Sequence, residues 1–340
     1  MFFFRCFCFL QSFFVCFLSY AGQAGSLSFS LKSQKELQTL QEYAKGSKLP
    51  VFIFFVGTTW CPWSEKMERE VFADPIFTQQ MQGMCLIARV QMPAKIGEDP
   101  HSIEIKSLMK QFDVQESPTI VLVSSQGQVI KKEGFSQLKV DDLCAYWKQC
   151  LISYDRINAI LEEPKGCFDE AELQKMYAEV KQLRLETLQD PILKIALSFA
   201  KEPYFYVEQY EKLSRTKKLK SPEMGLLRKK IIDLDPDNKH LSHLHLAMID
   251  FAKKQVCSKQ KKKPHQVAAP LLDYIEKYGK KDGQHLGNIE MLLAQFFLSR
   301  GEYQSAREYA KKSYTRAGSD SIKKERLSLV EYIDLCLQTK

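Results

Sequence analysis

The hydrophobic and polar positions divide this chain into two parts of different character. Between residues 29 and 150, short apolar runs alternate with segments whose apolar positions recur at helical spacing. The runs at 51–57 and 85–92 are continuous and rich in β-formers, which is typical of strands buried on both faces. No comparable run occurs in 151–340. The pattern predicts an α/β domain followed by an all-helical domain.

The α/β part is predicted to hold four further helical segments and a hairpin. The stretch after Cys61 and Pro62 places Met67, Val71 and Phe72 at helical spacing. The remaining predicted elements are a helix at 31–48 closed by Gly46, a helix at 103–114, a hairpin at 118–135 turning at Gln126–Gly127, and a helix at 140–151. Together they predict a central mixed sheet flanked by helices.

The second part is predicted to be a string of helices, and two of them have a proline near the start. Asp190–Pro191 and Ser221–Pro222 combine a capping residue with a proline suited to the first helical turn. Residues 292–318 resemble a tetratricopeptide-type helix pair, and 242–278 hold a weaker unit, so we expect a degenerate helical-repeat domain. The predicted helices cover 155–162, 169–188, 190–200, 204–214, 221–233, 240–255, 265–278, 285–299, 302–317 and 320–338.

The first 24 residues have the pattern of a secretory signal peptide. One positive charge, Arg5, precedes an apolar run that ends near Leu18, and Gly22 and Ala24 suit the −3 and −1 positions of a cleavage site. The run is short for a membrane span, although an uncleaved N-terminal anchor remains an alternative. We therefore expect an exported protein, periplasmic in a Gram-negative bacterium, with domains at 25–150 and 151–340.

Composition and charge narrow the class of protein. The 340 residues are 45% hydrophobic and 26% charged, which fits about two globular domains and excludes a mostly disordered chain. Residues 1–150 hold 15 Lys and Arg against 14 Asp and Glu, and 151–340 hold 34 against 27, so the net charge of +8 lies almost wholly on the helical part. The lysine-rich stretch Lys253–Lys263 lacks interleaved aromatic residues, which favours a solvated loop over nucleic-acid binding. Weak contact with an acidic membrane is the other alternative.

One cysteine stands where a thiol becomes reactive. Cys61 follows the predicted strand 51–57 directly and precedes a predicted helix. The positive end of the helix dipole and the free backbone N–H groups there stabilise a thiolate and lower the pKa of the thiol. Pro62 fits the first helical turn, and Trp60 and Trp63 flank the sulfur with apolar surface. A nucleophilic cysteine is therefore predicted, against the alternative of an ordinary buried one.

Two separated motifs resemble those of the thioredoxin superfamily. WCPWSEKMEREVF is similar to the active-site segment of its exported branch, and FDVQESPTIVLVSSQGQVIKKEGF is similar to its second hallmark. The layout resembles exported bacterial proteins described as thioredoxin disulfide isomerases. The resemblance implies that Pro118 is cis beside the active-site sulfur and that the backbone of Ser117 pairs with an extended substrate. It thereby places Trp60, Pro62, Trp63, Ser117 and Pro118 along a substrate groove.

The chain departs from that family at two positions. Ser64 stands where the second cysteine of the Cys-x-x-Cys motif is found, so the site cannot close its own disulfide, although Cys61 can still form mixed disulfides. The Ser64 hydroxyl could donate a hydrogen bond to the Cys61 thiolate. Phe55 stands where many thioredoxins carry a buried acid, which fits a site without a resolving thiol. Isomerisation, removal of small-thiol adducts and prolonged holding of a client all remain open.

The seven cysteines beyond the signal are an odd number, so at least one thiol stays unpaired. Cys85 opens a predicted strand and is expected in the core. Cys144 and Cys150 lie about 9 Å apart along one helix, which is too far for a disulfide. A bridge between Cys150 and Cys167 remains open, while Cys257 is expected to be exposed and Cys336 packed on the last helix.

Two functions from different classes follow. The first is an exported, isomerase-like thiol-disulfide oxidoreductase with Cys61 as nucleophile, protein substrates, a redox partner or small thiol, and no metal or organic cofactor. The second is a redox-inactive binding or folding factor whose helical domain holds partners. The cluster of His240, His243 and His245 near Asp235 and Asp237 does not share one helical face, so a zinc site is not expected.

Overall fold

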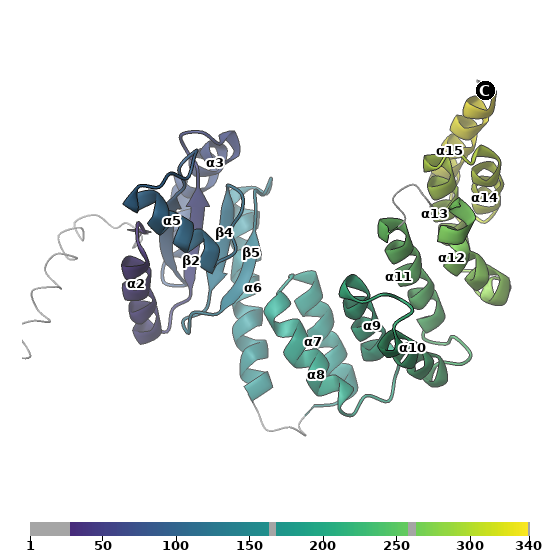
Figure 1. Cartoon of the computed structure of the whole chain (residues 1–340), viewed down its shortest axis with the longest axis horizontal. Coiled ribbons are helices and arrows are strands. Elements are labelled where there is room, and N and C mark those ends of the chain that lie inside the picture. Colours follow the sequence, from purple (N-terminus) through teal and green to yellow (C-terminus); the bar gives the residue numbers. More distant parts are fainter. Residues whose placement is uncertain (1–27, 163–167, 258–262, 339–340) are drawn as a thin grey trace, which may run out of the picture. The chain divides into compact units, whose positions relative to one another are not determined.

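A computed structural model describes residues 28–162, 168–257 and 263–338 (Figure 1). The chain divides into two compact units, residues 1–192 and residues 193–340, and each is described by itself. The predicted signal peptide, Cys167 and the lysines between 258 and 262 lie outside the described residues. None of the helices in the described ranges is both long and apolar enough to cross a membrane.

The first unit contains a mixed five-stranded sheet in the order β1-β3-β2-β4-β5. β3 pairs in parallel with β1 and β2, whereas β4 runs antiparallel to β2 and β5. The predicted strands and the hairpin turning at Gly127 are confirmed, and among the strands in the described ranges the sequence pattern missed the three-residue edge strand β1. The strands are β1 (Ser28–Ser30), β2 (Val51–Val56), β3 (Leu86–Gln91), β4 (Thr119–Val123) and β5 (Val129–Glu133).

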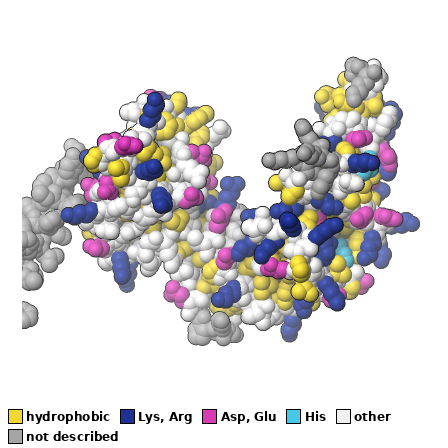
Figure 2. All heavy atoms as spheres, in the orientation of Figure 1, with side chains coloured by type: hydrophobic (Ala, Val, Ile, Leu, Met, Phe, Trp, Pro, Cys, Tyr) yellow, Lys and Arg dark blue, Asp and Glu magenta, His cyan; other side chains and the backbone are white. Residues whose placement is uncertain are grey.

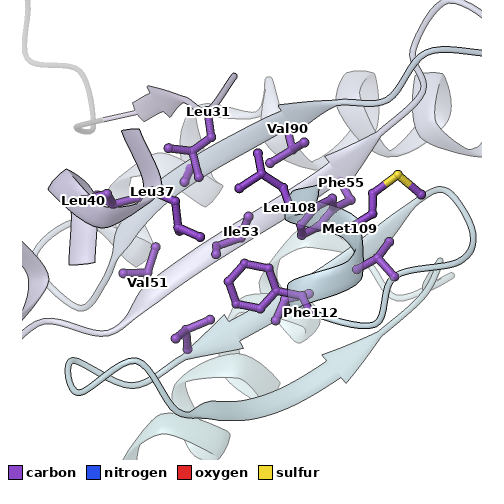
Figure 3. Packing of buried hydrophobic residues seen from close by; sticks show 14 of the residues in the cluster. Leu31, Leu37, Leu40, Val51, Ile53, Phe55, Val90, Leu108, Met109 and Phe112 are labelled. Atoms are coloured by element: carbon purple, nitrogen blue, oxygen red, sulfur yellow. The ribbon is translucent and has the colours of Figure 1, made fainter. Parts of the chain in front are cut away.

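Helices cover both faces of the sheet, and the fully buried strand β2 supplies side chains to each. Val51, Ile53 and Phe55 pack with side chains from α2 (Gln34–Ser47) and α5 (Pro100–Gln111), as Figure 3 shows. On the other face, the ring of Phe52 contacts those of Phe77, from α4 (Pro75–Met81), and Trp147, from α6 (Val140–Glu162). This burial on both faces explains the unbroken apolar run from which the strand was predicted.

Two predicted breaks differ from the structure because tertiary packing continues the helix. Gly46 does not close α2, which runs through Ser47 to Lys48, a residue in the left-handed conformation. The helices predicted at 140–151 and 155–162 form one continuous helix, α6. Along α6, Cys150, Leu151, Tyr154 and Ile157 are buried, so the apolar face continues through the predicted gap.

The helix predicted at 169–188 is in fact two helices, α7 (Glu170–Gln182) and α8 (Glu186–Leu197). Arg184 has a φ of 55° between them, and the Leu185 N–H reaches back to the Val180 carbonyl at 2.9 Å. Pro191 lies inside α8 and does not start it, so the predicted start at Asp190–Pro191 is wrong. The start of α10 (Pro222–Leu234) at Ser221–Pro222 is confirmed, with the Ser221 hydroxyl accepting from the Met224 N–H.

The second unit is helical throughout its described residues. α13 and α14 form the helix pair that 292–318 predicts, and Ala306 and Ala310 of α14 are fully buried. Figure 2 shows Lys and Arg side chains gathered over helices of this unit, in line with its positive charge. The remaining helices are α9 (Tyr204–Thr216), α10 (Pro222–Leu234), α11 (Ser242–Cys257), α12 (Pro264–Tyr278), α13 (Leu286–Ser299), α14 (Tyr303–Thr315) and α15 (Asp320–Gln338).

The lysine-rich stretch predicted as a loop is helical where the structure describes its first half. Lys253, Lys254 and Cys257 belong to the last turns of α11, whose side toward Phe251 is buried. Cys257 is exposed, as predicted.

Candidate active site

Cys61 lies at the junction between β2 and the helix α3 (Pro62–Met67), where the sequence places it. The N–H groups of Trp60 and Cys61 both donate to the Gly57 carbonyl, at 3.0 and 2.7 Å, so the chain turns tightly between strand and helix. Pro62 occupies the first helical position, where an N–H would have no acceptor within the helix, so its absence costs no hydrogen bond. α3 then continues as a π-helical turn, η1 (Glu68–Phe72). Cys61 is only 7% exposed.

Trp60 folds over the turn and fixes its shape. Its indole N–H donates to the Met92 carbonyl at 2.8 Å. A Cβ added to Gly57 would lie 2.4 Å from the indole ring, so any other residue at this position would displace the indole. The indole is still 41% exposed, which leaves an apolar surface beside the cysteine.

The two predicted motifs meet at the sulfur. The Ser117–Pro118 peptide bond is cis, as the resemblance implies. The Cys61 thiol donates to the Ser117 carbonyl at 3.2 Å, and the hydroxyls of Ser64 and Ser117 lie 2.7 Å apart. Ser64 is fully buried, and its oxygen also accepts the Gly57 N–H at 3.1 Å. Two segments more than fifty residues apart in sequence thus form one hydrogen-bonded cluster.

This cluster makes the Cys61 thiol more acidic. Burial by itself raises the pKa of Cys61, but hydrogen bonds from the Ser64 hydroxyl, the N–H groups of Ser64 and Trp63, and the Ser117 hydroxyl outweigh it. The pKa of Cys61 therefore lies below its ordinary value, as the sequence predicts. The Ser64 hydroxyl thus favours the thiolate form of Cys61, as predicted. The same hydroxyl is also hydrogen-bonded to the Gly57 N–H and to the Ser117 hydroxyl.

Three other thiols of the same unit have the opposite character. Burial raises the pKa of Cys85 to about 12, with a further contribution from the nearby Cys144, and burial also raises the pKa of Cys144. Burial raises the pKa of Cys150 to about 11. Each of these thiols is buried and protonated at neutral pH, so none competes with Cys61 as a nucleophile. Cys150 is a free thiol among the described residues, and its proposed bridge to Cys167 stays a prediction.

Trp63 lies on the surface two residues after Cys61 and contacts Phe135, an aromatic residue that the sequence did not indicate as part of the site. Trp63 is 52% exposed, and its ring centroid lies 4.7 Å from that of Phe135. The Lys66 ammonium lies 5.8 Å from the centre of the same Phe135 ring. The available signal was the aromatic residue directly after Gly134 at the end of the hairpin, but only the folded chain brings it to α3.

The histidine cluster has a structural place. The Asp235 carboxylate accepts the N–H groups of His240 and Ser242, and the His243 ring nitrogen lies 2.9 Å from the Asp235 carbonyl. These contacts order the chain before α11. Within the described ranges, no group of three or more His, Cys, Asp or Glu is placed to hold a metal ion.

Comparison with known proteins identifies the fold class of this site. Residues 37–148 match the family model of the thioredoxin-like domain. With its mixed sheet and flanking helices, this part of the chain is a thioredoxin-like domain, as its two sequence motifs predict.

The most similar proteins include two from Chlamydia pneumoniae. Thioredoxin-related protein DsbJ is 24% identical over 320 residues, which cover 91% of this chain and 88% of that protein. Disulfide bond reductase DsbH is 28% identical over 97 residues, 28% of this chain and 57% of that protein. Among solved structures, a DsbH oxidoreductase is 21% identical with a TM-score of 0.33, covering 38% of this chain and 88% of the other. A thioredoxin from Thermus thermophilus is 18% identical with a TM-score of 0.29, covering 38% and 89%.

Proposed function

We propose that this chain is an exported thiol-disulfide oxidoreductase of the isomerase type that acts on protein substrates through Cys61. The observation that carries the proposal is the cluster of Cys61, Ser64 and Ser117, which lowers the pKa of one thiol and supplies no second thiol beside it. Similarity to thioredoxin-related and disulfide-reductase proteins supports the class of reaction.

The reaction begins when the Cys61 thiolate attacks one sulfur of a client disulfide. A bond forms between Cys61 and that sulfur, the client disulfide breaks, and the other client sulfur leaves as a thiolate. A client thiolate then attacks the mixed disulfide, which forms a new client disulfide and returns Cys61 as a thiolate. No electrons are gained or lost overall, so the cycle exchanges disulfide partners without an oxidant. When a small thiol attacks the Cys61 sulfur instead, the client leaves with both cysteines reduced and Cys61 stays bound to the small thiol; a second small thiol then frees Cys61 as a thiolate and leaves as the oxidised small-thiol disulfide.

Ser64 decides between exchange and net redox chemistry. A cysteine at this position would attack the mixed disulfide from within the site and release a reduced client. A serine hydroxyl cannot form that bond, so the mixed disulfide with Cys61 lasts until another thiol arrives. The proposed partners are therefore exported proteins with disulfides or thiols, together with a small thiol or redox partner.

The alternative is a redox-inactive binding or folding factor. The helical second unit favours it, because a series of packed helices offers surface for protein partners. On this alternative the thioredoxin-like domain holds partners without turnover, and the Cys61 sulfur is dispensable.

Refolding of a scrambled disulfide protein, with a small thiol supplied, tests the proposal. We expect the full chain to speed recovery of the native disulfides, Cys61→Ala to abolish the effect, and Cys257→Ser, at an exposed thiol of the other unit, to leave it unchanged. Non-reducing electrophoresis of the same samples should show mixed disulfides with the client. Their amount should fall in Ser64→Cys, because an internal thiol then resolves them.

Two results would contradict the proposal, and the first of them would favour the alternative. A Cys61→Ala chain that promotes refolding as well as the original would show that the sulfur is not used. Mixed disulfides that form equally on Cys61→Ala would assign the reaction to another thiol.

A further inference from the structure

A pocket opens beside the Trp63–Phe135 pair, along the face of α3 and η1 on which Trp63 lies. Its volume is about 630 Å³, within the range of ligand-binding pockets. One wall is this helical face and the other is the segment between β5 and α6. The lining residues are Lys66, Met67, Glu70, Val71, Phe135, Ser136, Gln137, Leu138, Lys139, Val140 and Asp141.

The lining combines an apolar floor with charges of both signs. Met67 and Val71 are almost fully buried, whereas Leu138 is 48% exposed and presents its side chain to solvent. Lys66 and Glu70 are both about half-exposed and form an ion pair at 3.8 Å. The two lysines of the lining are balanced by Glu70 and Asp141, so the pocket does not select an anion or a cation. Such a lining suits an uncharged apolar side chain.

The pocket is linked to the cysteine site through Trp63. Trp63 directly follows Pro62, and its ring packs on Phe135, which itself lines the pocket. Met67 lies six residues after Cys61, about 9 Å along a helix at 1.5 Å per residue. An extended peptide covers that length in about three residues, at roughly 3.3 Å each.

We propose that this pocket is a specificity subsite for clients, which takes a large apolar side chain about three residues from the client cysteine bound to Cys61. The inference rests on the proposed function and adds a substrate class to it: segments in which leucine, isoleucine, methionine or an aromatic residue stands at that spacing. Trp63 and Phe135 lie beneath the intervening residues, and Leu138 closes the pocket over the apolar side chain.

Short Gly/Ser peptides with one cysteine, carried as a mixed disulfide with thionitrobenzoate, provide the probe. Attack by the Cys61 thiolate forms the Cys61–peptide disulfide and releases the coloured thionitrobenzoate anion, so the rate is read directly. The peptides carry either leucine or alanine three residues before or three residues after the cysteine. Rates for the full chain are corrected by those of Cys61→Ala.

We expect the leucine peptide to react about tenfold faster than its alanine counterpart in one of the two directions, the size of effect that a few methylenes have in an apolar pocket. Leu138→Asp should bring that ratio close to one. Ile103→Asp, a matched change at a 55% exposed residue of α5 outside the pocket, should leave the ratio at its original value.

Equal rates for leucine and alanine peptides in both directions, with reaction still dependent on Cys61, would overturn the subsite and leave the proposed function standing. A preference that survives Leu138→Asp would place the apolar contact elsewhere and also overturn it. Failure of every peptide to react through Cys61 would contradict the proposed function itself, and the subsite with it.

Discussion

At the scale of single residues, Ser64 explains how the site keeps a reactive thiol without a second one. Its hydroxyl is buried between the Gly57 N–H and the Ser117 hydroxyl, so it is held in one place beside the cysteine. A cysteine here would resolve mixed disulfides, whereas the serine retains only the hydrogen bond that lowers the pKa of Cys61. The residue at position 64 can therefore lower the pKa of Cys61 without also resolving the mixed disulfide.

The pH dependence of alkylation tests this account. Thiolate reacts and thiol does not, and the pKa of Cys61 is lowered, so its reaction with iodoacetamide should reach half its maximal rate at a pH below the ~8.5 of an unperturbed thiol. Ser64→Ala removes the largest lowering contribution and should move the midpoint to higher pH. Ser107→Ala, at an exposed serine of α5, is the matched control and should not move it. Labelling at Cys61 is followed by peptide mass spectrometry across pH.

A midpoint at 8.5 or above in the original chain would contradict the lowered pKa. An unchanged midpoint in Ser64→Ala would show that the backbone N–H groups act without the hydroxyl.

The sequence predicted the parts of this site that lie within its two motifs. The position of Cys61 follows from its place between a strand and a helix, whereas Ser64 in place of the second cysteine of the motif and the cis bond before Pro118 follow from the resemblance to the thioredoxin superfamily. Phe135 and the fit of Trp60 over Gly57 could not be predicted in the same way. Both depend on which side chain reaches across from another element, and one sequence contains no direct signal for such a contact.

At the scale of elements, several helices end on a left-handed residue that is not glycine. Lys48, Asp113 and Arg184 have φ values of 57°, 48° and 55°. In each case the next residue is apolar, and its N–H donates to the carbonyl five residues earlier: Leu49 to Ala44, Val114 to Met109, and Leu185 to Val180. Val114 and Leu185 are buried and Leu49 is partly buried against the core, and this packing compensates for the unfavourable left-handed conformation, so these helix ends carry no glycine that a sequence pattern could detect.

This explains why the helical boundaries were harder to predict than the strands. Gly46 and Pro191 are the strongest local stop and start signals, yet both lie inside helices. The helices end instead where Leu49 packs against the core and where Leu185 is buried.

One glycine substitution after the end of α7 and another inside α7 should therefore change the free energy of unfolding in opposite directions. Arg184→Gly relieves the left-handed conformation and should raise the free energy of unfolding by about 0.5–1 kcal/mol. Ala178→Gly, at an exposed position inside α7, should lower it by about 1 kcal/mol. Trp60, Trp63 and Trp147 are the three tryptophans of the chain and all lie in the first unit, so fluorescence during urea unfolding reports on that unit. Destabilisation by both changes would contradict the capping role of Arg184.

At the scale of the whole molecule, the question is how far the folded unit around the thioredoxin-like domain extends. The change in composition predicts a boundary at 150, whereas the first compact unit runs to Ile192. Lys131 of β5 is only 4% exposed, and its ammonium donates to the Leu183 carbonyl, after α7, at 2.6 Å. The Tyr154 hydroxyl of α6 donates to the Gln128 side chain of the hairpin at 3.0 Å. Hydrogen bonds, one buried and one partly buried, thus join the sheet to residues beyond 150.

Shortened chains decide where the stable unit ends. A chain of residues 28–150 cuts α6 in its middle, removes the buried Leu151, Tyr154 and Ile157, and leaves the Lys131 ammonium without the Leu183 carbonyl. Each lost apolar side chain is worth about 2 kcal/mol, so its Tm should be lower than that of 28–200 by about 10 °C or more. A chain of 28–162 keeps α6 and lacks α7 and α8, and its Tm should lie between those of the other two chains.

Because removing the acceptor of a buried charge is costly, Lys131→Met should stabilise 28–162 while changing the stability of 28–200 much less. Equal Tm values for 28–150 and 28–200, followed by tryptophan fluorescence, would instead place the boundary at 150 and make α7 and α8 part of the helical domain alone.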